Sequence, residues 1–357
     1  YTFKKSKALW KEAQKLIAGG SQGTRCPELP EWPIYFERAK GCRMWDVDGN
    51  EYIDFLCSIG PMLLGYAYKR VDDAVRAVIK TSFQSSMNHP LQLELARILI
   101  DMIPCADKVR LLKTGTEATQ GAIRLARLIT KRMHVTRFGY HGWHDMFIRA
   151  WNNPGADKDT GDKVLDFGGT AEGLEALFKK TRKKFAAVIL CPADTRPFTK
   201  ANYQGIIDVA HEHGALVIFD EIKSGFRIAP GGAQEVLGVK PDLTTVSKGI
   251  ANGYPLSAIV GRDKWMKELP KAGFAGTFSV EALSIAAAIA TLKEVREKDV
   301  PAHLARVGQR MIDGLNEISG RLGIGAHAYA DPVPAMPRFV WPGGKVGGGA
   351  MSVDDAH

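Results

Sequence analysis

Apolar residues along this chain of 357 residues follow two spacings that alternate. Repeats every three or four positions predict amphipathic helices, and short continuous or alternating apolar runs predict strands. The predicted helices are 6–16, 70–82, 91–102, 116–131, 203–213, 280–298 and 301–322, and the predicted strands are 108–113, 134–139, 186–191, 215–220, 243–247 and 256–261.

The order of these elements predicts the class of fold. The strand ALVIFD (215–220) is almost continuously apolar, which indicates burial on both faces, as in a parallel sheet. Helices that alternate with such strands are typical of an α/β sheet covered on both sides. Before them, CRMWDVDGNEYIDFL (42–56) places Asp48-Gly49 between two alternating runs, which predicts a hairpin.

Composition indicates a water-soluble protein with reduced thiols. The apolar fraction of 45% and the charged fraction of 24% are ordinary for globular proteins. Because no apolar run reaches about 18 residues, we expect no membrane span. The five cysteines (26, 42, 57, 105 and 191) are scattered and form no Cys-x-x-Cys pair. That pattern favours a cytoplasmic enzyme over a disulfide framework.

The net charge of +9 raises the question of a nucleic-acid partner. The positive charge is spread along the chain, and its densest block, KKTRKK (179–184), follows a helix-like stretch at 174–178. A solvated helix end explains such a block, so we expect no nucleic acid as partner. A basic surface would also attract anionic substrates.

Two strand ends carry candidate chemistry. The strand 215–220 ends in Asp220 and Glu221, and the strand 243–247 is followed by Lys248. Ligands of open α/β sheets collect at the carboxyl ends of the strands. An acid and a lysine 28 residues apart would therefore face one cleft. On position alone, a structural ion pair or two unrelated surface residues is the simpler interpretation.

A third feature is a helix start that suits an anion. In LLKTGTEATQGAIRLARLITKR (111–132), Thr114 and Glu117 have the spacing of a capping box. Gly115 lets the backbone approach a ligand closely, and the first N–H groups with the helix dipole bind phosphate. Neither G-x-x-x-x-G-K-S/T nor G-x-G-x-x-G is present, so a nicotinamide cofactor is not predicted. A capped helix without a ligand is the alternative.

The fourth feature is GYHGWHD (139–145), at another strand end. His141 and His144 raise the possibility of a metal site, but H-E-x-x-H and a nearby cysteine are missing, so no metal is expected. Tyr140 instead offers a ring that can stack on a flat cofactor. Phosphate cradle, aromatic ring, carboxylate and lysine together are what pyridoxal phosphate requires. The lysine forms a Schiff base with the aldehyde, and the aspartate keeps the pyridine nitrogen protonated.

Several of these stretches also resemble one known family. VIFDEIKSGFR (217–227), DLTTVSKGIANGYPLSAIVGR (242–262), TGTEATQGAIRLAR (114–127) and GYHGWHD are similar to class III aminotransferases of fold type I. IYFERAKGCRMWDVDGNEYIDFLCSIGPMLLGYA (34–67) resembles the glutamate-1-semialdehyde aminomutase-like subgroup, and the likeness covers roughly residues 10 to 320. It implies a mainly parallel seven-stranded sheet with flanking helices plus a smaller α+β domain. The domains implied are 1–60 (small), 61–285 (large, cofactor-binding) and 286–357 (small).

The resemblance also implies roles for matching residues. Lys248 would carry the Schiff base and move a proton between substrate and cofactor. Asp220 would pair with the pyridine nitrogen. Thr277, in FAGTFS, would reach the phosphate of a neighbouring subunit, which implies a homodimer with shared sites. The other implied cofactor-binding residues are Gly115 and Thr116 at the phosphate, Ile222 and Tyr140 on the two ring faces, and His141 in support, with Glu117 behind them and Arg227 in a structural role.

Some departures from the family bear on the reaction. Cys191-Pro192 replaces a Glu-Pro, TFSVEALS (277–284) lacks a Gly-Asn-Pro, and the segment after Asp145 is short. We therefore expect an aminotransferase that moves nitrogen from an amino donor to a carbonyl acceptor in two half-reactions. An aminomutase acting within one molecule is the first alternative, and a non-catalytic basic binding protein is a remote one.

The stretches expected to face the substrate are GGSQGTRCPELPEWP (19–33) and SSMNHP (85–90). Within the first, Arg25 either holds a carboxylate in a bidentate manner or is solvated. The sequence does not distinguish these two roles of Arg25.

Overall fold

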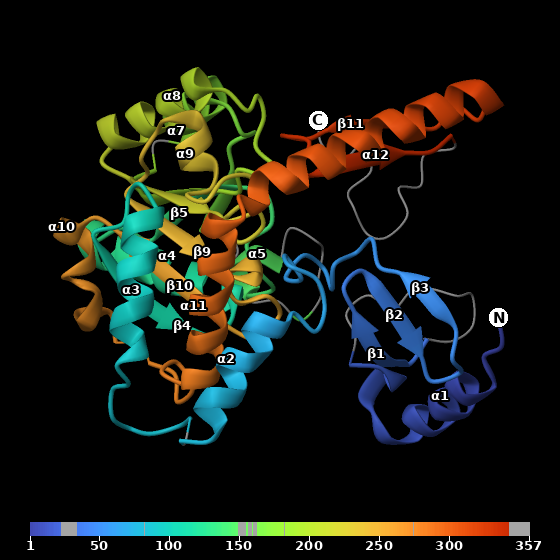
Figure 1. Cartoon of the computed structure of the whole chain (residues 1–357). Coiled ribbons are helices and arrows are strands. Elements are labelled where there is room, and N and C mark those ends of the chain that lie inside the picture. Colours follow the sequence, from blue (N-terminus) through green and yellow to red (C-terminus); the bar gives the residue numbers. More distant parts are fainter. Residues whose placement is uncertain are drawn as a thin grey trace.

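The computed structural model describes residues 1–22, 34–81, 83–148, 155, 159, 163–181, 183–273 and 275–342. A seven-stranded sheet lies at its centre, in the order β4-β10-β9-β8-β7-β5-β6 (Figure 1). Strand β10 runs opposite to the other six strands and pairs antiparallel with β4 and β9. The predicted α/β fold with a mainly parallel sheet is thus confirmed. The strands are β4 (Lys108–Leu112), β5 (His134–Phe138), β6 (Val164–Asp166), β7 (Phe185–Leu190), β8 (Leu216–Asp220), β9 (Leu243–Val246) and β10 (Ser257–Gly261).

Helices cover both faces of this sheet, as the apolar strands predict. Every residue of β8 is buried. Ile218 packs in a cluster with α4 (Gly115–Thr130) on one face, and Phe219 packs with α7 (Ala171–Thr181) and α8 (Lys200–Glu212) on the other. The basic block that begins at position 179 lies at the exposed end of α7 and beyond it, as expected of a solvated helix end.

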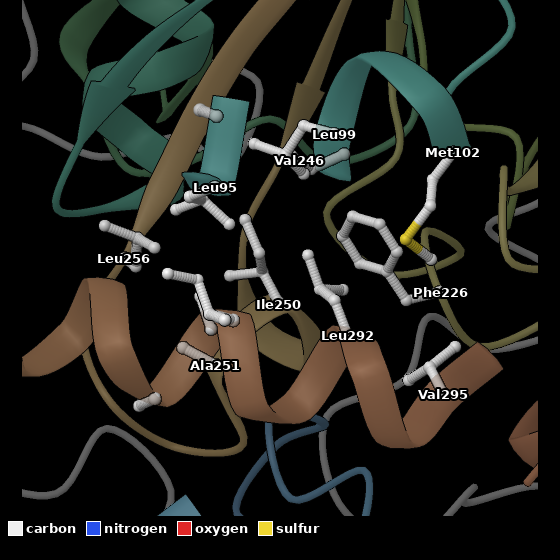
Figure 2. Close-up of a cluster of buried hydrophobic side chains, with 14 of the residues drawn as sticks. Leu95, Leu99, Met102, Phe226, Val246, Ile250, Ala251, Leu256, Leu292 and Val295 are labelled. Carbon is white, nitrogen blue, oxygen red and sulfur yellow. The ribbon is translucent and has the colours of Figure 1, made fainter. Parts of the chain in front are cut away.

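A third group of helices fixes the turn that follows β9. It comprises α2 (Lys69–Ile79), α3 (Leu91–Met102) and α11 (Ala282–Glu297). Figure 2 shows side chains of α3 and α11 meeting those of the turn. In that turn Ile250 and Ala251 are fully buried. Core packing therefore holds the backbone immediately after Lys248.

The two ends of the described chain form smaller structures beside this body (Figure 1). Near the N-terminus, β2 and β3 form the predicted hairpin, and Asp46 Oδ1 accepts hydrogen bonds from the N–H groups of Asp48 and Asn50 in its turn. The division into domains stays a prediction; α11 spans position 285 and packs on α2 and α3. The elements are α1 (Lys4–Leu16), β1 (Phe36–Lys40), β2 (Arg43–Asp46), β3 (Glu51–Ile53), α12 (Val300–Leu322), β11 (His327–Ala330) and β12 (Pro337–Val340).

The apolar pattern does not predict four of the strands, namely β1, β6, β11 and β12. They are three to five residues long and carry polar or small residues, as in FERAK and HAYA, so little alternation is visible. Three short helices also escape it: α5 (Asp145–Ile148), α9 (Ala233–Leu237) and α10 (Asp263–Met266). In the part of the chain that the structure describes, no helix is long and apolar enough to cross a membrane.

Candidate active site

Asp220 and Lys248 lie at the same edge of the sheet. Asp220 is the last residue of β8, Lys248 follows the end of β9, and the two strands are parallel neighbours. Lys248 has a φ of 46°, in the left-handed region that a bulky residue seldom adopts. The surrounding structure holds this strained conformation from both sides. Core packing fixes the residues after Lys248, and the Ser247 hydroxyl before it donates to the Leu256 carbonyl at 2.8 Å.

The amine of Lys248 is tuned by its surroundings. Burial lowers the pKa of Lys248, and the positive charge of Lys223 lowers it further. A lowered pKa leaves more of the amine neutral at a given pH, and the neutral amine is the nucleophile. Lysine at this position is therefore suited to bond covalently with an aldehyde.

Asp220 is held in a buried hydrogen-bond network. Its Oδ2 lies 2.8 Å from Nδ1 of His141, and both side chains are almost fully buried. The other ring nitrogen, Nε2 of His141, lies 3.0 Å from the Phe138 carbonyl oxygen, which can only accept. Nε2 is therefore the donor in that contact, and Nδ1 faces the carboxylate of Asp220. The network fixes the carboxylate at the strand end and orients it.

The start of α4 has the geometry of an anion site. Thr114 Oγ1 accepts from the Glu117 N–H at 3.2 Å, and Glu117 Oε2 accepts from the Thr114 N–H at 2.8 Å, so the predicted capping box is confirmed. The N–H groups of Gly115 and Thr116 have no acceptor within the helix. A Cβ at position 115 would lie 2.6 Å from Cδ1 of Ile222. Glycine thus lets the side chain of Ile222 pack directly against the helix start.

The turn after β5 packs against this helix start. The Thr119 hydroxyl donates to the His141 carbonyl at 2.8 Å, and a Cβ at Gly142 would lie 2.6 Å from Thr116 Oγ1. Tyr140, in the same turn, is 37% exposed. Within the described residues, no group of three or more His, Cys, Asp and Glu side chains is arranged to hold a metal.

Thr277 lies in an exposed turn, where its carbonyl accepts from Gln84 Nε2 at 2.9 Å. Its described contacts include neither Lys248 nor Gly115. Residues 85–88 are exposed nearby. Arg25 and most of the segment after Asp145 fall outside the described residues, so their expected roles stay predictions.

A cavity of about 1130 Å³ opens at Lys248. The loop at 53–66 forms one wall, and α12 with β12 forms another. Arg227 also lines it and donates from Nη2 to the Gly60 carbonyl at 2.6 Å, which ties the loop to the sheet edge. That contact fits the structural role expected of Arg227. Gly60 itself lies against the Lys248 side chain, since a Cβ there would be 3.6 Å from Lys248 Cδ.

One feature of this cavity escapes the sequence reasoning, namely the ion pair of Lys223 with Asp194. Lys223 Nζ lies 2.7 Å and 3.0 Å from the two carboxylate oxygens of Asp194. Asp194 follows the end of β7 and Lys223 follows the end of β8, which are parallel neighbours. The strand-end rule that selects Asp220 and Lys248 would have selected this pair as well.

Comparison with known proteins gives the family. Residues 27–324 match the family described as aminotransferase class-III, so the chain belongs to the class-III aminotransferases. It is 38% identical to the 3-aminobutyryl-CoA aminotransferase of Cloacimonas acidaminovorans, over 83% of this chain and 73% of that protein. It is 36% identical to the glutamate-1-semialdehyde 2,1-aminomutase of Desulforudis audaxviator, over 93% of this chain and 82% of that protein.

A solved structure agrees with this assignment. The FumI protein of Sphingopyxis sp. MTA144, determined in its PLP internal aldimine form, superposes with a TM-score of 0.87 at 30% identity, over 94% of this chain and 83% of that one. The chain is therefore a pyridoxal-phosphate enzyme of fold type I that transfers amino groups. The residues present fit the cofactor. The amine of Lys248 has a lowered pKa and lines the cavity, the buried carboxylate of Asp220 ends the neighbouring strand, and Gly115 at the start of α4 packs against Ile222, two residues after Asp220.

Proposed function

We propose that this enzyme moves an amino group between two separate molecules, an amino donor and a carbonyl acceptor, with Lys248 as the residue that binds the cofactor covalently. The observation that carries the assignment of Lys248 is its amine of lowered pKa at the strand edge that also holds Asp220. Pyridoxal phosphate supplies an aldehyde for covalent bonding and a ring that accepts electrons from the substrate carbon.

The residues around Lys248 have separate tasks in this proposal. N–H groups of Gly115 and Thr116 hold the phosphate at the start of α4. Asp220, oriented by His141, would pair with the pyridine nitrogen and keep it protonated. Lys248 takes the proton from the substrate carbon and returns it on the way to product.

Two side chains would pack on the faces of the cofactor ring in the proposed site. Ile222 lies beside Gly115 and would cover one face of the ring, and Tyr140 would cover the other. Both side chains exclude water from the reacting bonds. Exclusion of water strengthens the interaction between the ring nitrogen and Asp220.

Intramolecular transfer is the second candidate, and the likeness to aminomutases over 93% of the chain favours it. An experiment that starts from the pyridoxamine form of the enzyme distinguishes transfer between two molecules from transfer within one. We expect it to convert a supplied carbonyl acceptor once and then to stop until an external amine is added. Sustained turnover of glutamate-1-semialdehyde without any external amine would overturn the proposal in favour of the aminomutase.

We further propose a homodimer in which Thr277 reaches the phosphate of the neighbouring subunit. Thr277 is exposed in the single chain, beside Phe278, which is 61% exposed. An exposed aromatic ring next to a polar residue is suited to an interface.

The free thiols at cysteines 42, 57, 105 and 191 support a reducing compartment, the cytoplasm.

A further inference from the structure

Two lysines share the cavity at the edge of the sheet. Lys248 follows β9, and Lys223 follows β8, its parallel neighbour. Lys223 is clamped by both oxygens of Asp194, at 2.7 Å and 3.0 Å, and neither side chain is more than a third exposed. The clamp fixes one ammonium group in the same cavity as the amine of Lys248, which has no such partner among its described contacts.

The two amines consequently differ in how firmly they hold a proton. Burial alone would lower the pKa of Lys223, but nearby negative charge, including the carboxylate of Asp194 bonded to it, raises that pKa overall. For Lys248 the balance is reversed, because burial and the charge of Lys223 together lower its pKa. Of the two amines in the cavity, Lys223 therefore holds its proton more firmly than Lys248 does.

The other ionisable groups around Lys248 do not replace Lys223. Asp220 is negative but is engaged with His141 at 2.8 Å. Cys191 is fully buried, and burial raises its pKa, so it is a neutral thiol at physiological pH. Arg227 adds positive charge, but it acts on Lys248 less than Lys223 does, and it is held by the Gly60 carbonyl.

We propose that Lys223, held as a cation by Asp194, is a positioning residue that keeps the Lys248 amine unprotonated whenever that amine is not bonded to the cofactor. The inference rests on the proposed function, in which Lys248 alternates between binding the cofactor and moving a substrate proton. A neutral amine has the lone pair that both tasks need. A fixed neighbouring charge is a known way to activate a lysine.

The test measures the protonation of Lys248 directly in the cofactor-free protein. Trace labelling with acetic anhydride over a series of pH values, followed by peptide mapping, gives the midpoint at which Lys248 becomes reactive. Lys223→Met should raise this midpoint by about one pH unit, the size of effect that a close charge exerts. Lys223→Arg keeps the charge and should leave the midpoint within a few tenths of the original.

Two further variants serve as controls. Lys240→Met removes an exposed lysine at the opposite end of β9 and should leave the midpoint unchanged. Lys223→Met with Asp194→Asn removes both charges of the clamp, so that no carboxylate is left unpaired; its midpoint should lie between those of the original protein and of Lys223→Met. An unchanged or lowered midpoint in Lys223→Met and in the double variant Lys223→Met with Asp194→Asn would overturn the proposal.

The outcome is separable from that of the proposed function. Acetylation reports the amine of Lys248 whether or not the cofactor binds there. Cofactor found on another lysine would remove the functional meaning of the shift without altering the shift itself. An unchanged midpoint with the cofactor on Lys248 would reject only the role of Lys223.

Discussion

At Lys248 the backbone turns left-handed and the amine enters a cavity that it shares with Lys223 and Arg227. The sequence predicts that Lys248 and Asp220 lie at one edge of the sheet, because they stand at or just after the ends of two consecutive parallel strands. It does not predict the charge around the amine, because that depends on which side chains of neighbouring strand ends turn inward. Asp194 and Lys223 are 29 residues apart; the strand-end rule places both at this edge of the sheet, and the fold shows that they form an ion pair.

Gly115 offers a prediction at the same scale. A Cβ there would lie 2.6 Å from Cδ1 of Ile222, the movable end of a side chain. In Gly115→Ala the new Cβ would overlap Ile222, so we expect the Ile222 side chain to move toward the proposed cofactor position. Overpacking of this kind costs about 1–3 kcal/mol. Cofactor affinity should then weaken about tenfold, measured by fluorescence titration.

Ile222→Val provides the matched rescue. It removes the Cδ1 atom, so the double variant Gly115→Ala with Ile222→Val should recover most of the lost affinity. If Ile222→Val gives no recovery on the Gly115→Ala background, the proposed contact between the two residues is not the cause of the loss.

At the scale of elements, long periodic segments are predicted well and short ones are not. Helix 301–322 is predicted within one residue of α12, because 23 residues repeat the pattern many times. By contrast, β6 has three residues, and its strand character comes from pairing with β5 rather than from its own sequence. The resemblance implies seven strands in the sheet, whereas the apolar pattern alone places six of them.

The docking of β11 and β12 on α12 can be tested at Gly308. A Cβ at this position would lie 1.8 Å from the Pro334 carbonyl oxygen, so the backbones must separate. We expect Gly308→Ala to lower the free energy of unfolding by about 1–3 kcal/mol. Urea unfolding followed by circular dichroism measures it.

Gly314→Ala is the control on the same helix. No atom lies within 4 Å of a Cβ at Gly314, and alanine favours the helix over glycine by about 1 kcal/mol. This variant should be slightly more stable than the original. Equal effects of the two substitutions would show that the connection 331–336 does not pack on α12 at Gly308.

For the whole molecule, the fold and the cofactor follow from sequence, whereas the assembly does not. Thr277 is exposed in the single chain, and the sequence assigns it to a neighbouring site only through family resemblance. Substrate recognition is similarly distributed, since the cavity walls come from the loop 53–66, α12 and β12, which are far apart in the chain. No local pattern encodes such a surface.

Subunit mixing tests the shared site. Lys248→Ala and Thr277→Ala homodimers are each expected to be impaired. If Thr277 acts across the interface, a mixed dimer contains one site with both residues intact. The purified mixed dimer should then have about half of the original activity, and the equimolar exchanged mixture about a quarter. If Thr277 acts within its own chain, every site in the mixed dimer keeps one defect, and mixing should restore no activity.

Lys248 is proposed to bond covalently with pyridoxal phosphate, and borohydride reduction of the holoenzyme followed by peptide mapping locates that bond. Reduction should fix a pyridoxyl group on the peptide containing Lys248, and Lys248→Ala should give no adduct at this position. A reduced adduct on Lys223 or on any other lysine of the original protein, or no adduct at all, would contradict the account and return the non-catalytic binding protein to consideration.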